Sequence, residues 1–318
     1  YIKDRRTTAA LRSSPQMAIP LVPLRAAQLF PSLGFGVGTA WFKCADDRKQ
    51  MLKAAVHAAL DAGFRHIDEA EMYENEDSTG EALQEWLSKH AVPRASLHIT
   101  SKVMSVDAEG GIEAVCRRSL QALGCEYFDL YLVHAPFQRD GSPFSASLPE
   151  VWRQMEALVD GGLAKAIGVS NWRASDLQAI YKDARIKPCC NQIEAHPYLQ
   201  QLSLVKYCAE RKISLCAYAP LAPLTKVPGG PVDAPVNAAA AAHGKTPAQI
   251  LLRWCLQTGK VPITTTSRPE RLEEYKGIFG FELNAGEVAA ISEAGKQSPR
   301  RLYWAQCPGY NADPRLEE

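Results

Sequence analysis

The sequence has no excess of charge of either sign. Its 318 residues include 36 lysines and arginines against 35 aspartates and glutamates, which gives a formal net charge of +1. No stretch of five or more like charges occurs. Proteins that bind nucleic acid through its phosphates usually carry a basic patch or a clear basic excess. We therefore expect no nucleic-acid partner.

Long apolar runs and paired metal-binding motifs are also missing. The most apolar window, residues 236–242, is far shorter than the roughly 20 residues that cross a membrane. The nine cysteines include no Cys-x-x-Cys pair, and the seven histidines show no metal-ligand spacing. We expect a cytoplasmic protein with reduced thiols, no bound metal and no membrane segment.

Residues 1–16 differ from the rest of the chain. They are rich in serine, threonine and arginine, contain one acid, Asp4, and precede Met17. They are interpreted as a disordered leader or expression remnant, as the region before an alternative start, or as a weak transit peptide. We therefore assign the folded domain to residues 17–318.

From residue 33 onward, short β-branched or aromatic runs alternate with helix-length segments. The length alone suggests two domains, at about 150 residues each. Eight strand–helix units instead predict a single (β/α)8 TIM barrel, preceded by an N-terminal hairpin, because a doubly wound sheet usually has five or six strands. The expected strands are 33–38, 64–68, 97–103, 128–134, 164–170, 188–193, 213–218 and 261–264. The expected helices are 48–62, 78–90, 112–123, 148–161, 174–184, 203–211 and 247–257.

Two segments fall outside this repeat. Residues 221–236 are rich in proline and glycine and are too long for an ordinary connection, which indicates a functional loop. The tail from Gln297 carries several aromatic residues in a polar context. We expect this tail to pack back over the active-site face.

Two nucleotide-binding motifs are incomplete. The glycines of GFGVGT leave Thr39 where the dinucleotide fingerprint needs its last glycine. In HGKTP, Ala239 stands where a phosphate loop needs its first glycine. Thr246 and Gln249 instead predict a helix capping box around Pro247.

Polar residues stand at the carboxyl ends of most expected strands. In a TIM barrel these ends meet on one face, where the active sites of such enzymes lie. Because isolated buried charges are costly, their recurrence favours one shared site over separate solvated strand ends. The residues are Asp68, Lys102, His134, Ser170, Asn171, Gln192 and Tyr218.

Seven segments, in order, resemble signatures of the aldo-keto reductases, and the resemblance covers residues 33 to about 298. The segments are GFRHIDEAEMYENE (63–76), TSKV (100–103), LYLVHAP (130–136), KAIGVSNW (165–172), CNQIEAHPY (190–198), AYAPL (217–221) and RPERLEEY (268–275). GVGTAWFK and TTTSRPER most resemble the fungal and yeast branch that reduces conjugated ketones.

The resemblance implies a catalytic tetrad of Asp68, Tyr73, Lys102 and His134. The implied reaction is NAD(P)H-dependent reduction of an aldehyde or ketone, with hydride from the nicotinamide and a proton from Tyr73. A nearby ammonium, Lys102, strengthens tyrosine as an acid, and Asp68 keeps that ammonium protonated and oriented. His134 would hydrogen-bond the substrate oxygen.

The resemblance also implies a cofactor site. Thr265 stands where many members carry a lysine against the 2'-phosphate, and Tyr275 stands where they carry asparagine, but Arg271 is retained. We therefore expect NADPH to be preferred and NADH to be used. The implied cofactor-binding residues are Gly38, Thr39, Ser170, Asn171, Gln192, Tyr218, Leu221, Thr265, Thr266, Arg271 and Glu274.

The substrate pocket is expected to be wide, because Met104 and Ala135 stand where tryptophan is common. Glu69 follows Asp68 where a small residue is usual, and it would either add negative potential or face solvent. The residues expected to line the pocket are Trp41, Met104, Phe137, Trp172 and Trp304, with Tyr310 as a further candidate.

Two other functions remain open from the sequence. One is an NAD(P)+-dependent alcohol or sugar dehydrogenase that uses the same residues in reverse. The other is a non-catalytic cofactor-binding protein, since fold alone does not imply function. The complete tetrad counts against the second. The expected partner is a small carbonyl substrate, and the expected state is a monomer or weak dimer.

Overall fold

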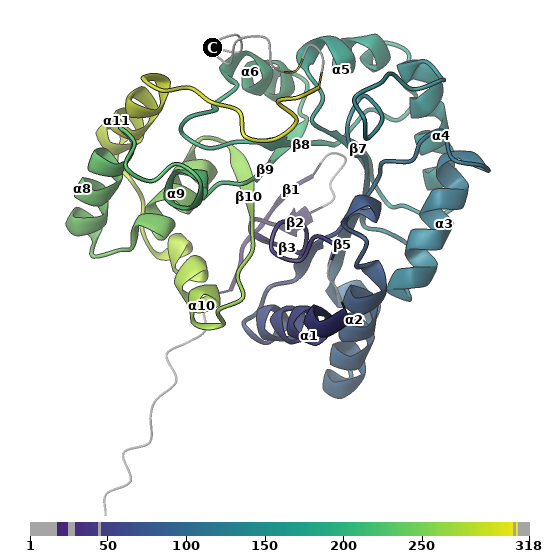
Figure 1. Ribbon diagram of the computed structural model, residues 1–318, viewed down its shortest axis with the longest axis horizontal. Coiled ribbons are helices and arrows are strands. Elements are labelled where there is room, and N and C mark those ends of the chain that lie inside the picture. Colours follow the sequence, from purple (N-terminus) through teal and green to yellow (C-terminus); the bar gives the residue numbers. More distant parts are fainter. Residues whose placement is uncertain (1–17, 25–28, 44–45, 308–309, 311–318) are drawn as a thin grey trace, which may run out of the picture.

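The eight predicted strand regions all form parallel strands, and these close into a barrel surrounded by helices (Figure 1). The computed structural model describes residues 18–24, 29–43, 46–307 and 310, so the leader expected at 1–16 lies outside it. β10 pairs with β3 and closes the ring, which confirms the (β/α)8 barrel. The strands are β3 (Gly34–Gly36), β4 (His66–Asp68), β5 (His98–Val103), β6 (Leu130–Val133), β7 (Ile167–Ser170), β8 (Cys190–Glu194), β9 (Ser214–Tyr218) and β10 (Lys260–Thr264).

The seven predicted helices are confirmed, and their ends follow local capping. At the start of α9, Gln249 N–H donates to Thr246 Oγ1 at 3.2 Å, with Pro247 in the first turn, so the capping box is present. The helices are α1 (Asp46–Asp61), α2 (Glu76–His90), α3 (Gly111–Leu123), α4 (Leu148–Asp160), α5 (Ala174–Tyr181), α6 (Leu202–Glu210), α7 (Ala222–Thr225), α8 (Asp233–His243), α9 (Pro247–Gln257), α10 (Glu270–Lys276) and α11 (Ala285–Lys296).

The expected long loop at 221–236 is shorter than predicted. It contains the four-residue helix α7 and ends inside α8. Helix α8 is alanine-rich, so it lacks the alternating apolar and polar faces by which the seven helices were predicted, and α7, α10 and α11 were not predicted either. Among the described helices, none is both long enough and apolar enough to cross a membrane.

An antiparallel pair, β1 (Leu21–Pro23) and β2 (Leu29–Pro31), covers the end of the barrel where the strands begin. Phe30 is fully buried, and its ring lies 6.0 Å from His66 and 5.8 Å from His98, the first residues of β4 and β5. The expected N-terminal hairpin is thus present. It closes one end of the barrel and leaves the other end for the site.

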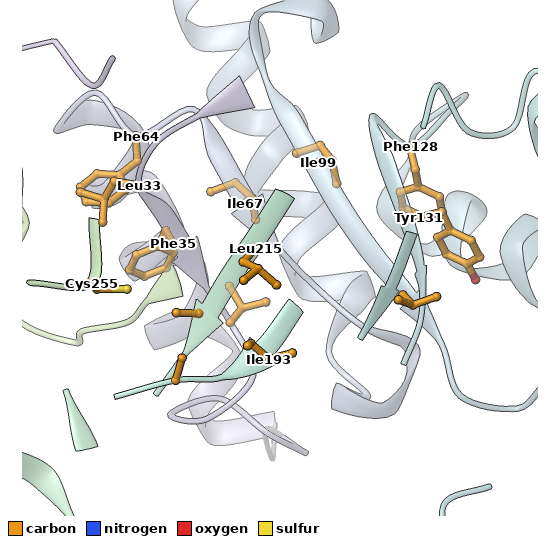
Figure 2. Close-up of a cluster of buried hydrophobic side chains, with 14 of the residues drawn as sticks. Leu33, Phe35, Phe64, Ile67, Ile99, Phe128, Tyr131, Ile193, Leu215 and Cys255 are labelled. Atoms are coloured by element: carbon orange, nitrogen blue, oxygen red, sulfur yellow. The ribbon is translucent and has the colours of Figure 1, made fainter. Parts of the chain in front are cut away.

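The largest hydrophobic core lies between the strands and the helices. Figure 2 shows part of it, with Phe35 beside Phe64 and Phe128 beside Tyr131. The first pair meets edge to face at 6.2 Å and the second stacks at 4.9 Å. This packing holds the strands, and therefore the residues at their ends, in fixed positions.

The C-terminal tail packs back onto the barrel, as expected. Trp304 and Tyr310 contact Phe137 edge to face, at 5.5 and 5.3 Å between ring centroids. Met104 and Ala135 belong to the same cluster. The tail therefore forms one wall of the open face.

Candidate active site

Three of the four tetrad residues stand at the ends of neighbouring strands, and all four meet at the open end of the barrel. Asp68 is the last residue of β4, Lys102 lies near the end of β5, and His134 follows β6. Tyr73 closes a short 3-10 helix, Glu71–Tyr73, that turns back over the strand ends. Parallel strand order therefore brings together residues that are up to 66 positions apart, from 68 to 134.

Lys102 is the centre of this arrangement and is fully buried. Its ammonium donates to Asp68 Oδ1 at 2.7 Å, to the Glu69 carbonyl at 2.9 Å and to Tyr73 Oη at 3.1 Å. The second Asp68 oxygen accepts from Gln192 Nε2 at 2.6 Å. All three lysine protons and both carboxylate oxygens are therefore used, which fixes the ammonium against the phenol.

The pKa values of the tetrad follow from burial and from the Lys102 charge. Burial raises the pKa of Tyr73 to about 12, although the Lys102 ammonium opposes this shift. Burial lowers the pKa of Lys102, but Asp68 and Tyr73 outweigh it and the net shift is upward. Burial and Lys102 hold the pKa of His134 well below its usual range. At neutral pH the site therefore holds a phenol, an ammonium and a neutral imidazole.

Glu69 is fully buried, which excludes the solvent-facing interpretation. Burial, followed by the nearby Glu76 carboxylate, raises the pKa of Glu69 well above its usual value. One of its oxygens accepts from the Ala70 N–H at 2.9 Å, and the hydrogen bonds to the carboxyl offset only part of the effect of burial on its pKa. The raised pKa favours the neutral acid, so Glu69 adds no fixed negative charge at low and moderate pH.

A hydrogen-bonded network continues across the ends of β7, β8 and β9. Ser170 Oγ donates to the Gln192 carbonyl at 2.8 Å, and Asn171 Nδ2 donates to the His134 carbonyl at 2.9 Å. Tyr218 Oη donates to Asn171 Oδ1 at 2.7 Å. These bonds hold the polar side chains of three strands in one orientation.

Two cavities meet at Tyr73. One, of about 380 Å³, lies over the tetrad, and the other, of about 460 Å³, extends between α7 and α10. Both are lined by Gly38, Thr39, Tyr73, Tyr218 and Tyr303. A Cβ added at Gly38 would lie 2.6 Å from the Tyr73 ring, so glycine is needed where the cavities join.

The second cavity has walls suited to a phosphate-bearing cofactor. Lys226, just after α7, and Arg271, on α10, are cations that line it. Tyr218 and Tyr303 lie edge to face, 5.6 Å apart, near the tetrad. Cations at one end and aromatic rings near Tyr73 fit the phosphates and the nicotinamide of a dinucleotide.

The family model described as the aldo/keto reductase family matches residues 33–296. The chain belongs to the aldo/keto reductase family. This range includes all eight barrel strands and every member of the tetrad.

Related reductases match over most of their lengths. The chain is 37% identical to the NADPH-dependent alpha-keto amide reductase of Saccharomyces cerevisiae over 293 residues, which covers 87% of this chain and 91% of the yeast protein. It is 38% identical to the NAD/NADP-dependent indole-3-acetaldehyde reductase of Schizosaccharomyces pombe over 279 residues, covering 86% and 94%. The Bombyx mori aldo-keto reductase, solved in complex with NADP, matches with a TM-score of 0.83 and 30% identity, covering 92% and 99%.

Most residues expected at the cofactor of this reductase line one of the two cavities. Ser170, Asn171 and Gln192 line the cavity over the tetrad. Thr266 lines neither, and its hydroxyl accepts from the Arg268 N–H at 3.0 Å. The remaining residues line the second cavity: Gly38, Thr39, Tyr218, Leu221, Thr265, Arg271 and Glu274. Lys226 was not predicted, because nothing in its local sequence distinguishes it from a surface lysine.

The substrate-pocket prediction needs correction at four positions, since only Trp304 lines the cavity over the tetrad. Trp41 and Trp172 are buried in the main core. Met104 and Phe137 lie in the cluster behind Trp304, so the expected widening at Met104 does not reach the cavity. The wall residues that the sequence did not indicate are Phe42, Met72, Tyr303 and Gln306.

Proposed function

We propose that this aldo/keto reductase uses NADPH to reduce a small aldehyde or ketone to the alcohol. The observation that carries the proposal is the buried Lys102 ammonium, bonded to Asp68 and Tyr73 where the two cavities meet. The named activities of the two fungal relatives support it. They also suggest the substrate class, which we propose to be carbonyls next to a second carbonyl or on an aryl-bearing chain.

The tetrad would complete the reduction by supplying a proton and a hydrogen bond. When bound, the dihydronicotinamide supplies hydride to the carbonyl carbon. The Tyr73 phenol donates its proton to the oxygen, which becomes the alcohol hydroxyl. Lys102 stabilises the phenolate left behind, and neutral His134 donates a hydrogen bond that orients the carbonyl oxygen.

We propose that Arg271 and Lys226 bind the cofactor phosphates. Thr265 and Tyr275 line the same cavity but are neutral. The selectivity for NADPH over NADH therefore depends on Arg271 and Lys226. Exposed charge pairs contribute little each, about 0.2–1 kcal/mol. We therefore expect NADPH to be preferred and NADH to be used at a measurable rate.

A Tyr73→Phe variant tests the chemistry. The change removes only the proton donor, and general acid catalysis is worth about 100- to 10,000-fold. We expect ketone reduction to fall by that range, while NADPH binding, followed by quenching of protein fluorescence, stays within about twofold. Full activity in this variant would refute the mechanism. A screen of aldehydes, α-ketoesters, diketones and aldoses with NADPH would define the substrate.

The reverse reaction, alcohol oxidation, needs Tyr73 as a phenolate base. Burial raises the Tyr73 pKa to about 12, which disfavours that form at neutral pH. Initial rates in both directions, at matched cofactor concentrations, would separate the two functions. Faster oxidation at pH 7 would favour a dehydrogenase.

We also propose a monomer or weak dimer in the cytoplasm. Its large exposed apolar side chains are spread over different elements, including Leu21 of β1, Met51 of α1 and Leu202 of α6. None of the eight cysteines in the described ranges forms a disulfide. Size-exclusion chromatography with light scattering would determine the mass of the protein in solution. A mass above that of a dimer would contradict the proposal.

A further inference from the structure

Glu194, the last residue of β8, is a fully buried carboxylate whose partners lie in the C-terminal tail. Its Oε1 accepts from the Leu302 N–H at 2.8 Å, and its Oε2 accepts from the Tyr303 N–H at 3.0 Å. The His196 Nε2 lies 2.9 Å from Oε1. Both carboxylate oxygens therefore accept hydrogen bonds. Glu194 lies two residues after Gln192, the residue of β8 that is bonded to Asp68 of the tetrad.

The hydrogen bonds between the Glu194 carboxylate and the tail stabilise both groups. A buried carboxylate is costly unless it accepts hydrogen bonds, and backbone N–H donors to a charged acceptor form strong ones. If the carboxylate is removed, the backbone N–H groups of Leu302 and Tyr303 lose their hydrogen-bond acceptor. We therefore regard Glu194 as the anchor of this part of the tail.

The connection that follows β8, residues 195–201, holds α11 and the first residues of the tail, up to Arg300. The Arg300 N–H donates to the Tyr198 carbonyl at 2.9 Å, and Gln200 Nε2 donates to the Ser292 carbonyl at 2.7 Å. Gly295 of α11 packs so closely that an added Cβ would overlap the Pro197 carbonyl. Helix α11 is thus fixed independently of Glu194, and only the tail beyond Arg300 depends on the carboxylate.

The anchored residues form the wall of the active site. Tyr303 lines both cavities, and Trp304 lines the cavity over the tetrad, 6.0 Å from the His134 ring. Trp304 has a left-handed backbone, with a φ of 59°, which a tryptophan rarely adopts without support. Glu194 itself lines neither cavity. Its side-chain hydrogen bonds lead to these walls through the tail. It also pairs with Tyr218 of β9, which lines both cavities and whose pKa is raised by burial and then by the Glu194 charge.

We propose that Glu194 is a positioning residue that sets substrate preference by holding Tyr303 and Trp304 over the tetrad. This proposal rests on the proposed function. Carbonyl compounds with an aryl or other bulky substituent would reach the Trp304 wall and depend on the anchor. A short aliphatic aldehyde would reach Tyr73 and His134 without touching the wall.

A Glu194→Gln variant tests the anchor directly. The amide keeps the shape but replaces one acceptor oxygen with an NH2 donor, so either Leu302 or Tyr303 must lose its partner. We expect hydrogen exchange in residues 301–307 to be faster by about tenfold or more, with exchange in α11 and at Arg300 unchanged. The matched control is Glu210→Gln, on the exposed end of α6, which should leave the tail unaffected.

Kinetics of the same variant test the link to substrate. We expect the KM for an aryl ketone to rise about tenfold while kcat stays within about twofold, and a short aliphatic aldehyde to be unaffected. Trp304→Ala should produce the same selective loss. For the aryl ketone, the loss in the double variant should be smaller than the sum of the two single losses, because both changes act in part through Trp304.

Three results would overturn the proposal: unchanged exchange in residues 301–307, additive losses in the double variant, or an equal loss for short and bulky substrates. Exchange needs no turnover, which keeps this test separate from the proposed function. If the unmodified protein reduced no carbonyl, the proposed function would fail and the substrate role of Glu194 would fail with it, whereas faster exchange would still establish the anchor.

Discussion

At the scale of single residues, the acidity of Tyr73 is set by opposing influences. Burial and the Asp68 carboxylate raise its pKa, and the Lys102 ammonium, 3.1 Å from the hydroxyl, lowers it. The net value of about 12 keeps the phenol protonated at physiological pH. Lys102 therefore does not ionise Tyr73 before the reaction. Its ammonium lies beside the phenol oxygen and stabilises the negative charge that forms there when the proton is transferred.

The Tyr73 pKa predicts a spectroscopic result. Since a raised pKa preserves the neutral phenol, the cofactor-free protein and its Tyr73→Phe variant should show equal phenolate absorbance at every pH up to about 10. Ultraviolet difference titration would measure this. A tyrosine that ionises near pH 8 in the parent protein and disappears in the variant would contradict it.

Glu69 predicts how stability depends on pH. Its pKa is raised in the folded state, so the folded protein holds this proton more tightly than the unfolded chain does. Stability is therefore lost as pH rises above the unfolded carboxyl pKa, by at most about 1.4 kcal/mol per pH unit. Glu69→Gln removes this ionisation, and its neutral amide should be tolerated.

Urea unfolding of both proteins between pH 5 and 8 would test the Glu69 prediction. The free energy of unfolding of Glu69→Gln, relative to the parent, should increase with pH. A difference that stays constant across this range would show that Glu69 does not titrate there. Glu71→Gln is the matched control, because it makes the same change at a half-exposed neighbour, whose Oε2 accepts from the Met104 and Ser105 N–H groups.

At the scale of elements, the parts that the sequence predicted are those with a local signal. Each barrel strand is a short apolar run, and each predicted helix has an apolar face or a cap. Helices α7, α8, α10 and α11 were not predicted. Helices α7 and α10 are short and α8 is alanine-rich, whereas α11 begins with an Asn284–Glu287 capping box that could have indicated it. The tetrad was predicted from strand ends and from motifs. Phe42 and Tyr303 reach the cavity from separate loops and Met72 from the 3-10 helix Glu71–Tyr73, and these three residues have no shared pattern.

The connection after β9 contains a lysine that we expect to contribute to selectivity for NADPH over NADH. Lys226 follows α7 and lines the cavity that Arg271 lines from α10. Lys226→Gln should weaken NADPH binding about three- to tenfold and leave NADH unchanged, because only NADPH carries the 2'-phosphate. Thr265→Lys, on the opposite wall, should strengthen NADPH binding by a similar factor.

Fluorescence titration with each cofactor would measure these affinities. The NADPH effect should shrink at high salt, because the contact is exposed and screened. Lys89→Gln, on the exposed end of α2, is the matched control for the loss of one positive charge. Equal weakening of NADPH and NADH by Lys226→Gln would assign this lysine to the phosphates that both cofactors share, and the selectivity prediction would be wrong.

At the scale of the whole molecule, the barrel has one closed end and one working end. The hairpin fills the closed end with Phe30 and Leu24, against interior residues such as Leu130 and Leu132. The working end is covered in part by the tail that Glu194 anchors. Stability and chemistry are therefore separated along the barrel axis, as is usual for this fold.

Phe30→Ala tests that separation. Removing a fully buried phenylalanine costs about 3–5 kcal/mol, so urea unfolding should show a loss of that size. The KM for NADPH and for substrate should not change, because the hairpin lies at the far end. Its neighbour Leu29 is 56% exposed, so Leu29→Ala should cost less than about 1 kcal/mol. Equal losses would show that Phe30 does not fill the closed end.

The pairing of β3 with β10 also has a consequence for how the protein is made. Ile263 pairs with Gly34, 229 positions earlier in the chain (263 minus 34). At about 5–20 residues per second, a ribosome needs on the order of 10 to 45 s to synthesise the segment between them. During that interval β3 has one bare edge, which is open to wrong pairing with other chains. A newly made chain must therefore be kept from pairing with other chains through the free edge of β3 until β10 has been synthesised.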